Sequence, residues 1–237
     1  MVSSCDLFKA VWEPFCHGFR KYWPDCPWTV KFITNNESAP DFEPLVMGDD
    51  GGPYGWSDMT KRALQQINTP VVLWIHDDNW LCRPVDTLTV VSLVRLFESR
   101  DLHLIRLSNC YMARTCGTYQ PDGRLRLMHP DSRQRMSLQP SLWRRETFLE
   151  LLVDNESPWK WEGEAPHRSH RVNGDFLCCQ EGFHPIHFLS HVDPDWNNEA
   201  VEKGKWTSSA VKYAQREGLS VDFSTHPNGN PNTEVPY

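Results

Sequence analysis

Two adjacent aspartates stand directly after the most apolar segment of the sequence. Residues 70–76 (PVVLWIH) form an apolar run that ends in Asp77 and Asp78. Such a run predicts a strand covered on both faces of a parallel sheet, and ligands of these sheets bind beyond the carboxyl ends of the strands. Adjacent carboxylates repel each other unless a cation or water lies beside them, and hard divalent cations take oxygen ligands. The pair therefore predicts a cation site that also holds a diphosphate; the alternative is a solvated turn.

A glycine-rich segment, GDDGGPYGWSD, occupies residues 48–58 and leads into a predicted helix capped by Ser57 or Asp58. Glycines let a backbone approach a ligand closely, and a helix N-terminus favours anions. The segment lacks the GK[ST] ending of a phosphate-binding P-loop. It is either an anion-binding loop or a flexible connection.

Residues 156–171 (ESPWKWEGEAPHRSHR) combine tryptophans, carboxylates and bases in a short stretch. Partial burial beside aromatic rings raises the pKa of a carboxyl group, which suits it to act as a general base. The aromatic faces could also hold a sugar or a nucleobase. The alternative is an amphipathic surface segment whose tryptophans belong to the core.

Three histidines, His184, His187 and His191, lie in a segment that predicts a strand. On a strand His187 and His191 would share one face and could reach a metal ion, although a lone histidine is usually a core residue. The motifs HExxH and GxSxG are absent, which argues against a metalloprotease and an α/β-hydrolase.

The elements that would position these residues alternate between strand and helix. Helices are predicted over residues 6–22, 57–67, 86–100, 143–153 and 209–217, with residues 157–170 forming a loop that enters another. Strands are predicted over residues 1–4, 28–34, 45–47, 70–76, 103–107 and 183–192, with a hairpin over residues 123–136. This alternation predicts an α/β fold, a mostly parallel sheet with helices on both sides.

Composition excludes several classes of protein. The 237 residues carry a net charge of -7, which argues against nucleic acid as a partner. No apolar run reaches the roughly 18 residues of a membrane span, so stable membrane insertion is not expected. The N-terminus lacks the pattern of a secretory signal, so we expect a cytoplasmic protein with reduced cysteines. None of the eight cysteines forms a CxxC pair, which disfavours a zinc ribbon.

The order of the motifs resembles a family of GT-A-fold glycosyltransferases from bacterial polysaccharide gene clusters and large viruses. The matching segments are SSCDLFKAVWEPFCHGFRKYWPDCPW, TVKFITNN, GWSDMTKRALQQI, PVVLWIHDDNW, SLQPSLWRRETFLELL and ESPWKWE, in residues 3–206. The resemblance implies a GT-A-like, Rossmann-like domain over residues 1–223. Its nucleotide-binding half would span residues 1–108 and its acceptor half residues 109–223, followed by an extended tail over residues 224–237.

The resemblance also implies a nucleotide-sugar donor, with a UDP-sugar favoured, and Mn²⁺ or Mg²⁺ as the cofactor. Asp77 and Asp78 take the place of the DxD-like motif, and Asn79 stands where a DDD-type variant has a third acid. Which of the two acids binds the metal stays open; we assign Asp78 to it, with His191 as a second ligand. The residues implied at the donor are Ser3, Ser4, Cys5, Thr34, Asn35, Trp56, Ser57, Asp58 and Asp77, with Arg168 and Lys205 near its phosphates.

The implied reaction transfers a sugar to a hydroxyl group of a glycan or of a lipid- or protein-linked acceptor. Glu162 is the expected base, and a single displacement would invert the anomeric centre, with a retaining reaction as the alternative. One alternative is a catalytically inactive sugar- or nucleotide-binding protein of the same fold. Another is a metal-dependent nucleotidyltransferase or sugar-phosphate hydrolase that uses Asp77 and Asp78.

Overall fold

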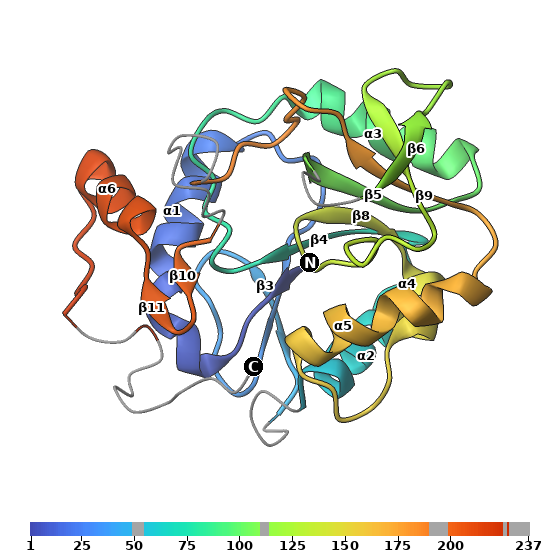
Figure 1. The fold of residues 1–237 in the computed structure, drawn as a ribbon. Helices are drawn as coiled ribbons and strands as arrows, with labels where there is room; N and C mark the ends of the chain where they lie inside the picture. The colour runs from blue at the N-terminus through green and yellow to red at the C-terminus, as the bar shows by residue number, and fades with distance from the viewer. Residues whose placement is uncertain (49–54, 110–113, 190–198, 225–226, 228–237) are drawn as a thin grey trace. The chain divides into compact units, whose positions relative to one another are not determined.

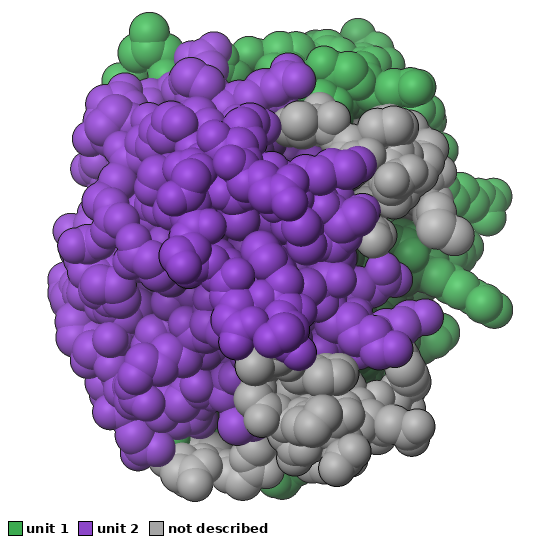
Figure 2. All heavy atoms as spheres, turned by 90° about the vertical axis from the view of Figure 1, so that its left-hand side faces the viewer, with its two compact units in different colours: residues 1, 47–75, 88–185 green, residues 2–46, 76–87, 186–237 purple. Residues whose placement is uncertain are grey.

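The computed structural model describes residues 1–48, 55–109, 114–189, 199–224 and 227. Two compact units make up the chain (Figure 2). Unit 1 contains residues 1, 47–75 and 88–185, and unit 2 contains residues 2–46, 76–87 and 186–237. Each unit is assembled from segments far apart in the sequence, whereas the predicted nucleotide-binding and acceptor halves are consecutive. The assignment of functions to those halves stays a prediction.

Unit 2 contains three parallel strands in the order β3-β2-β1. These are β1 (Val2–Ser3), β2 (Lys31–Thr34) and β3 (Glu43–Val46). A 3-10 helix, η1 (Asp6–Val11), continues directly into α1 (Trp12–Tyr22), in agreement with the helix predicted over residues 6–22. Later in the chain come the hairpin of β10 (Val201–Glu202) and β11 (Lys205–Trp206), and then α6 (Ser208–Glu217), all labelled in Figure 1.

The core of unit 2 forms where α1 packs on β2. Apolar residues of α1 recur at steps of three and four, so they form one face of the helix. On that face, the rings of Trp12 and Phe15 meet the buried ring of Phe32 edge-on, with centroids 5.7 and 5.8 Å apart. This packing fixes the end of β1, because Trp12 also hydrogen-bonds to residue Ser4.

Unit 1 contains the strands in the order β4-β8-β5-β9-β7-β6. Their bounds are Val71–His76 (β4), Leu102–Asn109 (β5), Thr115–Thr118 (β6), Leu125–Met128 (β7), Ser141–Arg144 (β8) and Asp175–Cys179 (β9). Strands β4, β5, β6 and β9 run in one direction, while β7 and β8 are antiparallel to their neighbours. The predicted α/β class with a mostly parallel sheet is therefore confirmed.

Helices lie on both faces of the strands of unit 1. They are α2 (Trp56–Gln65), α3 (Thr87–Ser99), α4 (Arg145–Leu151) and α5 (Pro158–Arg168), followed by the 3-10 turn η3 (Ser169–Arg171). On β8, Trp143 packs against Phe148 of α4 and Trp161 of α5. Its neighbour Arg144 lies over the ring of Phe97 of α3. Successive residues of a strand point to opposite faces, so α3 covers one face, and α4 and α5 the other.

Three local predictions are wrong. The helix predicted over residues 143–153 begins at Arg145, because Trp143 belongs to strand β8. The predicted hairpin over residues 123–136 is β6 and β7, which begin at Thr115. The described part of residues 183–192, which were predicted to form a strand, contains a single bridge, between Leu81 and Phe188. The strand in this part of the chain is β9, which ends earlier, at Cys179. Pro185 has no N–H to donate to a ladder, which disfavours a strand there.

Within the described residues, no helix combines the length and the apolar character that crossing a membrane requires.

Candidate functional site

Asp77 lies against the carboxyl end of β1 in unit 2. Its backbone N–H donates to the carbonyl of Ser3 (3.2 Å), and its carboxylate accepts a hydrogen bond from the hydroxyl of Ser4. Trp12 Nε1 donates in turn to Ser4 Oγ (2.6 Å), so a helix, a strand end and the aspartate form one chain of contacts. Asp77 is 7% exposed. Burial raises its pKa to about 7, although the hydrogen bonds from Ser4 and Trp12 act in the opposite direction.

Asp78 is half-buried and lies beside the segment that leads into the C-terminal hairpin. Its carbonyl accepts a hydrogen bond from the N–H of Ala200 (2.8 Å). Burial, followed by repulsion from Glu199 and from Asp77, raises the pKa of its carboxyl group well above the ordinary value. Among the residues that the structure describes, no lysine, arginine or histidine forms an ion pair with Asp78. A bound cation would offset the repulsion between these neighbouring carboxylates.

The oxygen-rich pair of Asp78 and Glu199 suits Mn²⁺ or Mg²⁺. Hard divalent cations bind carboxylate oxygens, and they keep other positions for water and substrate phosphates. In the described part of the chain no group of three or more histidine, cysteine or acidic side chains could hold a metal ion. The donor set would therefore be two carboxylates completed by a ligand. His191, the predicted second ligand, lies outside the described residues.

The turn that presents the two aspartates is held by Asn79 and Trp80. The side chain of Asn79 accepts a hydrogen bond from the N–H of His76 (3.0 Å), and its own N–H donates to the carbonyl of His76 (3.1 Å). Trp80 is fully buried against Trp206 and Tyr213. Asn79 thus has a structural role at the position where a third acid would stand.

Asp6 joins the ends of β1 and β2. Its carboxylate accepts hydrogen bonds from the N–H groups of Asn35 (3.1 Å) and Asn36 (2.9 Å), while the Asn35 side chain accepts one from the N–H of Asp6 (3.0 Å). Thr34 is fully buried and donates its hydroxyl to the carbonyl of Glu37. Burial, with a contribution from Asp77, raises the pKa of the Cys5 thiol to about 12. Lys205 is exposed on β11.

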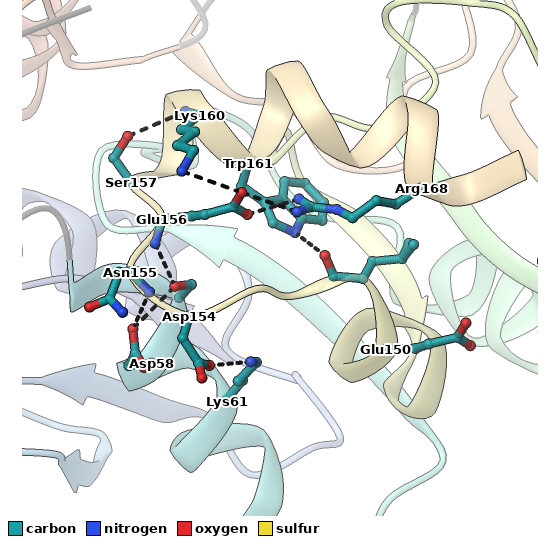
Figure 3. A network of polar contacts seen from close by, with 12 residues as sticks. Asp58, Lys61, Glu150, Asp154, Asn155, Glu156, Ser157, Lys160, Trp161 and Arg168 are labelled. Atoms are coloured by element: carbon teal, nitrogen blue, oxygen red, sulfur yellow. Dashed lines mark hydrogen bonds and ion pairs between the residues drawn. The ribbon is translucent and has the colours of Figure 1, made fainter. Parts of the chain in front are cut away.

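A second cluster of predicted residues lies in unit 1, where the start of α2 meets residues 154–157 (Figure 3). The N–H of Ser57 donates to the carbonyl of Glu156 (3.2 Å), and the N–H of Glu156 donates to Ser57 Oγ (3.0 Å). The N–H of Asn155 donates to the carboxylate of Asp58 (2.8 Å). The prediction that Ser57 or Asp58 caps α2 is therefore wrong: the cap residue is Gly55, and both side chains bind the other segment.

Glu156 and Arg168 form a two-pronged ion pair at the ends of α5. Nη1 and Nη2 of Arg168 lie 3.0 and 2.8 Å from the two carboxylate oxygens of Glu156, which is 2% exposed. Figure 3 shows this pair beside Trp161. The guanidinium predicted to approach donor phosphates is thus already engaged by a carboxylate. Sequence reasoning missed Glu156, because only the fold brings it opposite Arg168.

The tryptophans of the motifs divide into core and surface residues. Trp56 and Trp161 are buried and meet edge-on, with centroids 6.0 Å apart. Trp161 Nε1 donates to the carbonyl of Leu151 (3.1 Å), which anchors α5 to the end of α4. Trp159, in contrast, is 42% exposed. Trp161 is therefore a core residue, as the alternative interpretation of residues 156–171 expects. Trp159 has an accessible aromatic face.

Glu162 projects from α5 toward the segment that precedes β8. Its carboxylate accepts a hydrogen bond from the N–H of Leu138 (2.6 Å), and the side chain is half-buried. One oxygen is thereby oriented, which leaves the carboxylate able to accept a proton at the other.

The structure thus brings the predicted residues together in two groups. Unit 2 gathers those at the ends of β1 and β2 and after β4, namely Ser3, Ser4, Cys5, Thr34, Asn35, Asp77 and Asp78. Unit 1 gathers Trp56, Ser57, Asp58 and Arg168. Sequence reasoning missed Asp6, Trp12 and Glu199, whose partners are distant in the sequence.

Comparison with known proteins gives no family. No protein-family model matches the chain, and neither does any curated protein. Among solved structures, the chain is similar to the bifunctional IspDF from Campylobacter jejuni, with 13% sequence identity and a TM-score of 0.39. The match covers 76% of this chain and 43% of that one, so this chain spans less than half the length of IspDF. At this level the likeness carries no information about activity.

Proposed function

We propose that this protein is a glycosyltransferase that uses a nucleoside-diphosphate sugar, with UDP favoured, and a divalent cation. The observation that carries the proposal is the hydrogen bond from the N–H of Ala200 to the carbonyl of Asp78, which brings Glu199 beside Asp78. Asp77, the neighbour of Asp78, is fixed on the end of β1. Carboxylates at the carboxyl ends of parallel strands face the usual ligand crevice of α/β proteins. Placing two carboxylates together there costs electrostatic energy, and a bound cation would remove that cost.

In this mechanism Asp78 and Glu199 would hold Mn²⁺ or Mg²⁺, and Asp77 orients the turn through its hydrogen bond from Ser4. When bound, the cation would neutralise the charge that develops on the departing diphosphate. Glu162, which the family resemblance implies as the base, would accept the proton of the acceptor hydroxyl as that oxygen attacks the anomeric carbon. The bond from that carbon to the diphosphate oxygen breaks, its electron pair leaves with the nucleoside diphosphate, and the anomeric configuration inverts. The acceptor is a hydroxyl of a glycan or of a lipid- or protein-linked carrier.

A thermal-shift panel tests the proposal. Unfolding is followed with UDP, GDP, CMP and dTDP, each with and without Mn²⁺, on the wild type, Asp78→Asn and Glu199→Gln. A nucleotide at 100 times its Kd should stabilise the wild type by about 2.7 kcal/mol. We expect one nucleotide to act only with the metal, and both variants to lose the effect. Glu202→Gln, at an exposed position of β10, is the matched control. No metal-dependent shift with any nucleotide would overturn the proposal.

Turnover separates the enzyme from its alternatives. Release of UDP from a UDP-sugar identifies a transferase, which also hydrolyses its donor slowly when no acceptor is present. Binding without release would indicate an inactive protein of the same fold. Formation of a sugar nucleotide from a sugar phosphate and a nucleoside triphosphate would indicate a nucleotidyltransferase.

A further inference from the structure

An open hollow of about 480 Å³ lies in unit 2 at the amino ends of β2 and β3. Its lining comes from the last turn of α1, from residues 23–30, which connect α1 to β2, and from residues 41–43. The candidate cation site lies beyond the opposite ends of these strands, where Asn35 follows β2. A strand of four residues is roughly 13 Å long. The hollow is therefore a separate place, and the proposed transfer reaction does not use it.

Aromatic rings form the walls of this hollow. Trp28 is 38% exposed, and its ring stands at 83° to that of Trp23, with centroids 6.1 Å apart. Phe42 stands at 82° to Phe19, at 5.3 Å. Trp23 is itself fixed, because its Nε1 donates to Thr87 Oγ1 (2.9 Å). Trp28 thus packs against a fixed ring and keeps part of its own ring exposed, so a ligand would lose little freedom in ordering it.

Charged groups at the rim are paired with one another, with one carboxylate in excess. Arg20 pairs with Asp41 and with Glu13, the latter at 2.8 Å, and Lys31 pairs with Glu43. The three carboxylates and two bases leave one net negative charge on an exposed rim. This charge repels an anion, and it adds only weakly to the attraction of the aromatic walls for an organic cation. The same groups remain hydrogen-bonding partners: carboxylate oxygens accept, and a guanidinium has five N–H donors. The rim fits a neutral ligand that carries many hydroxyl groups.

We propose that this hollow binds a neutral pyranose ring of a glycan, as a subsite remote from the transfer reaction. The C–H face of the ring lies on Trp28, and its hydroxyls donate to Asp41 and accept from Arg20. Ligand sites of this kind combine an apolar, aromatic surface with a few fixed polar groups. Such a subsite would hold a long glycan on the protein through a sugar residue other than the reacting one.

Saturation-transfer NMR with neutral oligosaccharides tests the subsite. The probes are cellotetraose, maltotetraose and chitotetraose, each without nucleotide or metal. We expect ring-proton signals with at least one of them, and an affinity at least fivefold weaker in Trp28→Ala. Asp41→Asn should also weaken binding, and it keeps the fold, because Asp41 has a φ of 70° that asparagine adopts readily. Leu88→Ala, at an exposed apolar residue of α3 in unit 1, should bind like the wild type.

The result is independent of the proposed transferase activity. Asp78→Asn should bind the oligosaccharide normally even though it loses the metal-dependent nucleotide shift. Absence of signal with all three probes would overturn the subsite. So would unchanged binding by Trp28→Ala, or binding of tetramethylammonium that Trp28→Ala abolishes, since the latter would mean a site for cations.

Discussion

Arg168 holds the carboxylate of Glu156 with two parallel N–H···O contacts, at 3.0 and 2.8 Å, on a side chain that is 2% exposed. The backbone of Glu156 is bonded at the same time to Ser57 at the start of α2. One residue therefore joins α2 to both ends of α5. Hydrogen bonds between Ser57 and Glu156, which lie 99 residues apart in the sequence, thus join the two motif segments GWSD and ESPWKWE.

The first prediction concerns this ion pair. Arg168→Met leaves the buried carboxylate of Glu156 with only the more distant and exposed Lys160, at 4.0 Å, and should lower the free energy of unfolding by about 3–5 kcal/mol. The double variant with Glu156→Gln should recover part of the loss, because no charge is then left unpaired. Urea unfolding measures both. Arg171→Met is the control: its pair with Glu150 is exposed on both sides, so the expected cost is about 0–1 kcal/mol. Equal losses at both arginines would contradict the structural role of Arg168.

The second prediction concerns the packing of α1 in unit 2. A Cβ atom at Gly18 would lie 2.7 Å from Tyr213 Oη and 2.8 Å from the carbonyl oxygen of Leu81. Gly18→Ala should therefore destabilise the protein by about 1–3 kcal/mol through overpacking. Gly163→Ala is the matched control in α5, where a Cβ would meet nothing within 4 Å. That change should stabilise the protein by about 0.5–1 kcal/mol. Thermal unfolding of both variants would settle the comparison, and a stable Gly18→Ala would mean that α1 and α6 are packed more loosely.

The sequence was sufficient where one element carries a clear period. Helix α1 and strand β4 were predicted because their apolar residues recur at helical spacing or form an unbroken run. Strands β8 and β9 have only four and five residues, too few for a period to separate strand from helix. The same limit applies to the site. Asp77 and Asp78 adjoin a recognisable strand, whereas Glu199 contributes only because the fold returns residue 200 to the carbonyl of Asp78.

The third prediction is a loss of stability in acid that Glu217 causes. Burial raises its pKa, but hydrogen bonds from Lys21, Tyr22, His17 and Arg216 outweigh burial and lower the pKa to about 2. In the unfolded chain the carboxyl group has its ordinary pKa of 4.5. Its stabilisation is therefore complete above about pH 4.5 and disappears as the pH falls toward 2.

Glu217→Gln isolates this contribution. The variant should be up to about 3 kcal/mol less stable at pH 6, and the difference from the wild type should shrink to near zero at pH 2. Urea unfolding at several pH values measures it. Glu13→Gln is the control, because Glu13 pairs with Arg20 at the surface. A difference that does not change with pH would exclude the ionised carboxylate as its source.

The last prediction tests Glu162 as the base. Glu162→Gln should keep the fold, because the amide oxygen can still accept the hydrogen bond from the N–H of Leu138 (2.6 Å in the wild type). An amide cannot take up the proton of the acceptor hydroxyl at neutral pH, so transfer should fall by roughly 10²–10⁴-fold. The thermal shift with nucleotide and Mn²⁺ should stay as in the wild type, since Glu162 is not assigned to the donor. Glu146→Gln, at an exposed position of α4, should transfer normally. Full transfer by Glu162→Gln would assign the base to another residue, with Asp58 and Glu164 the next to replace.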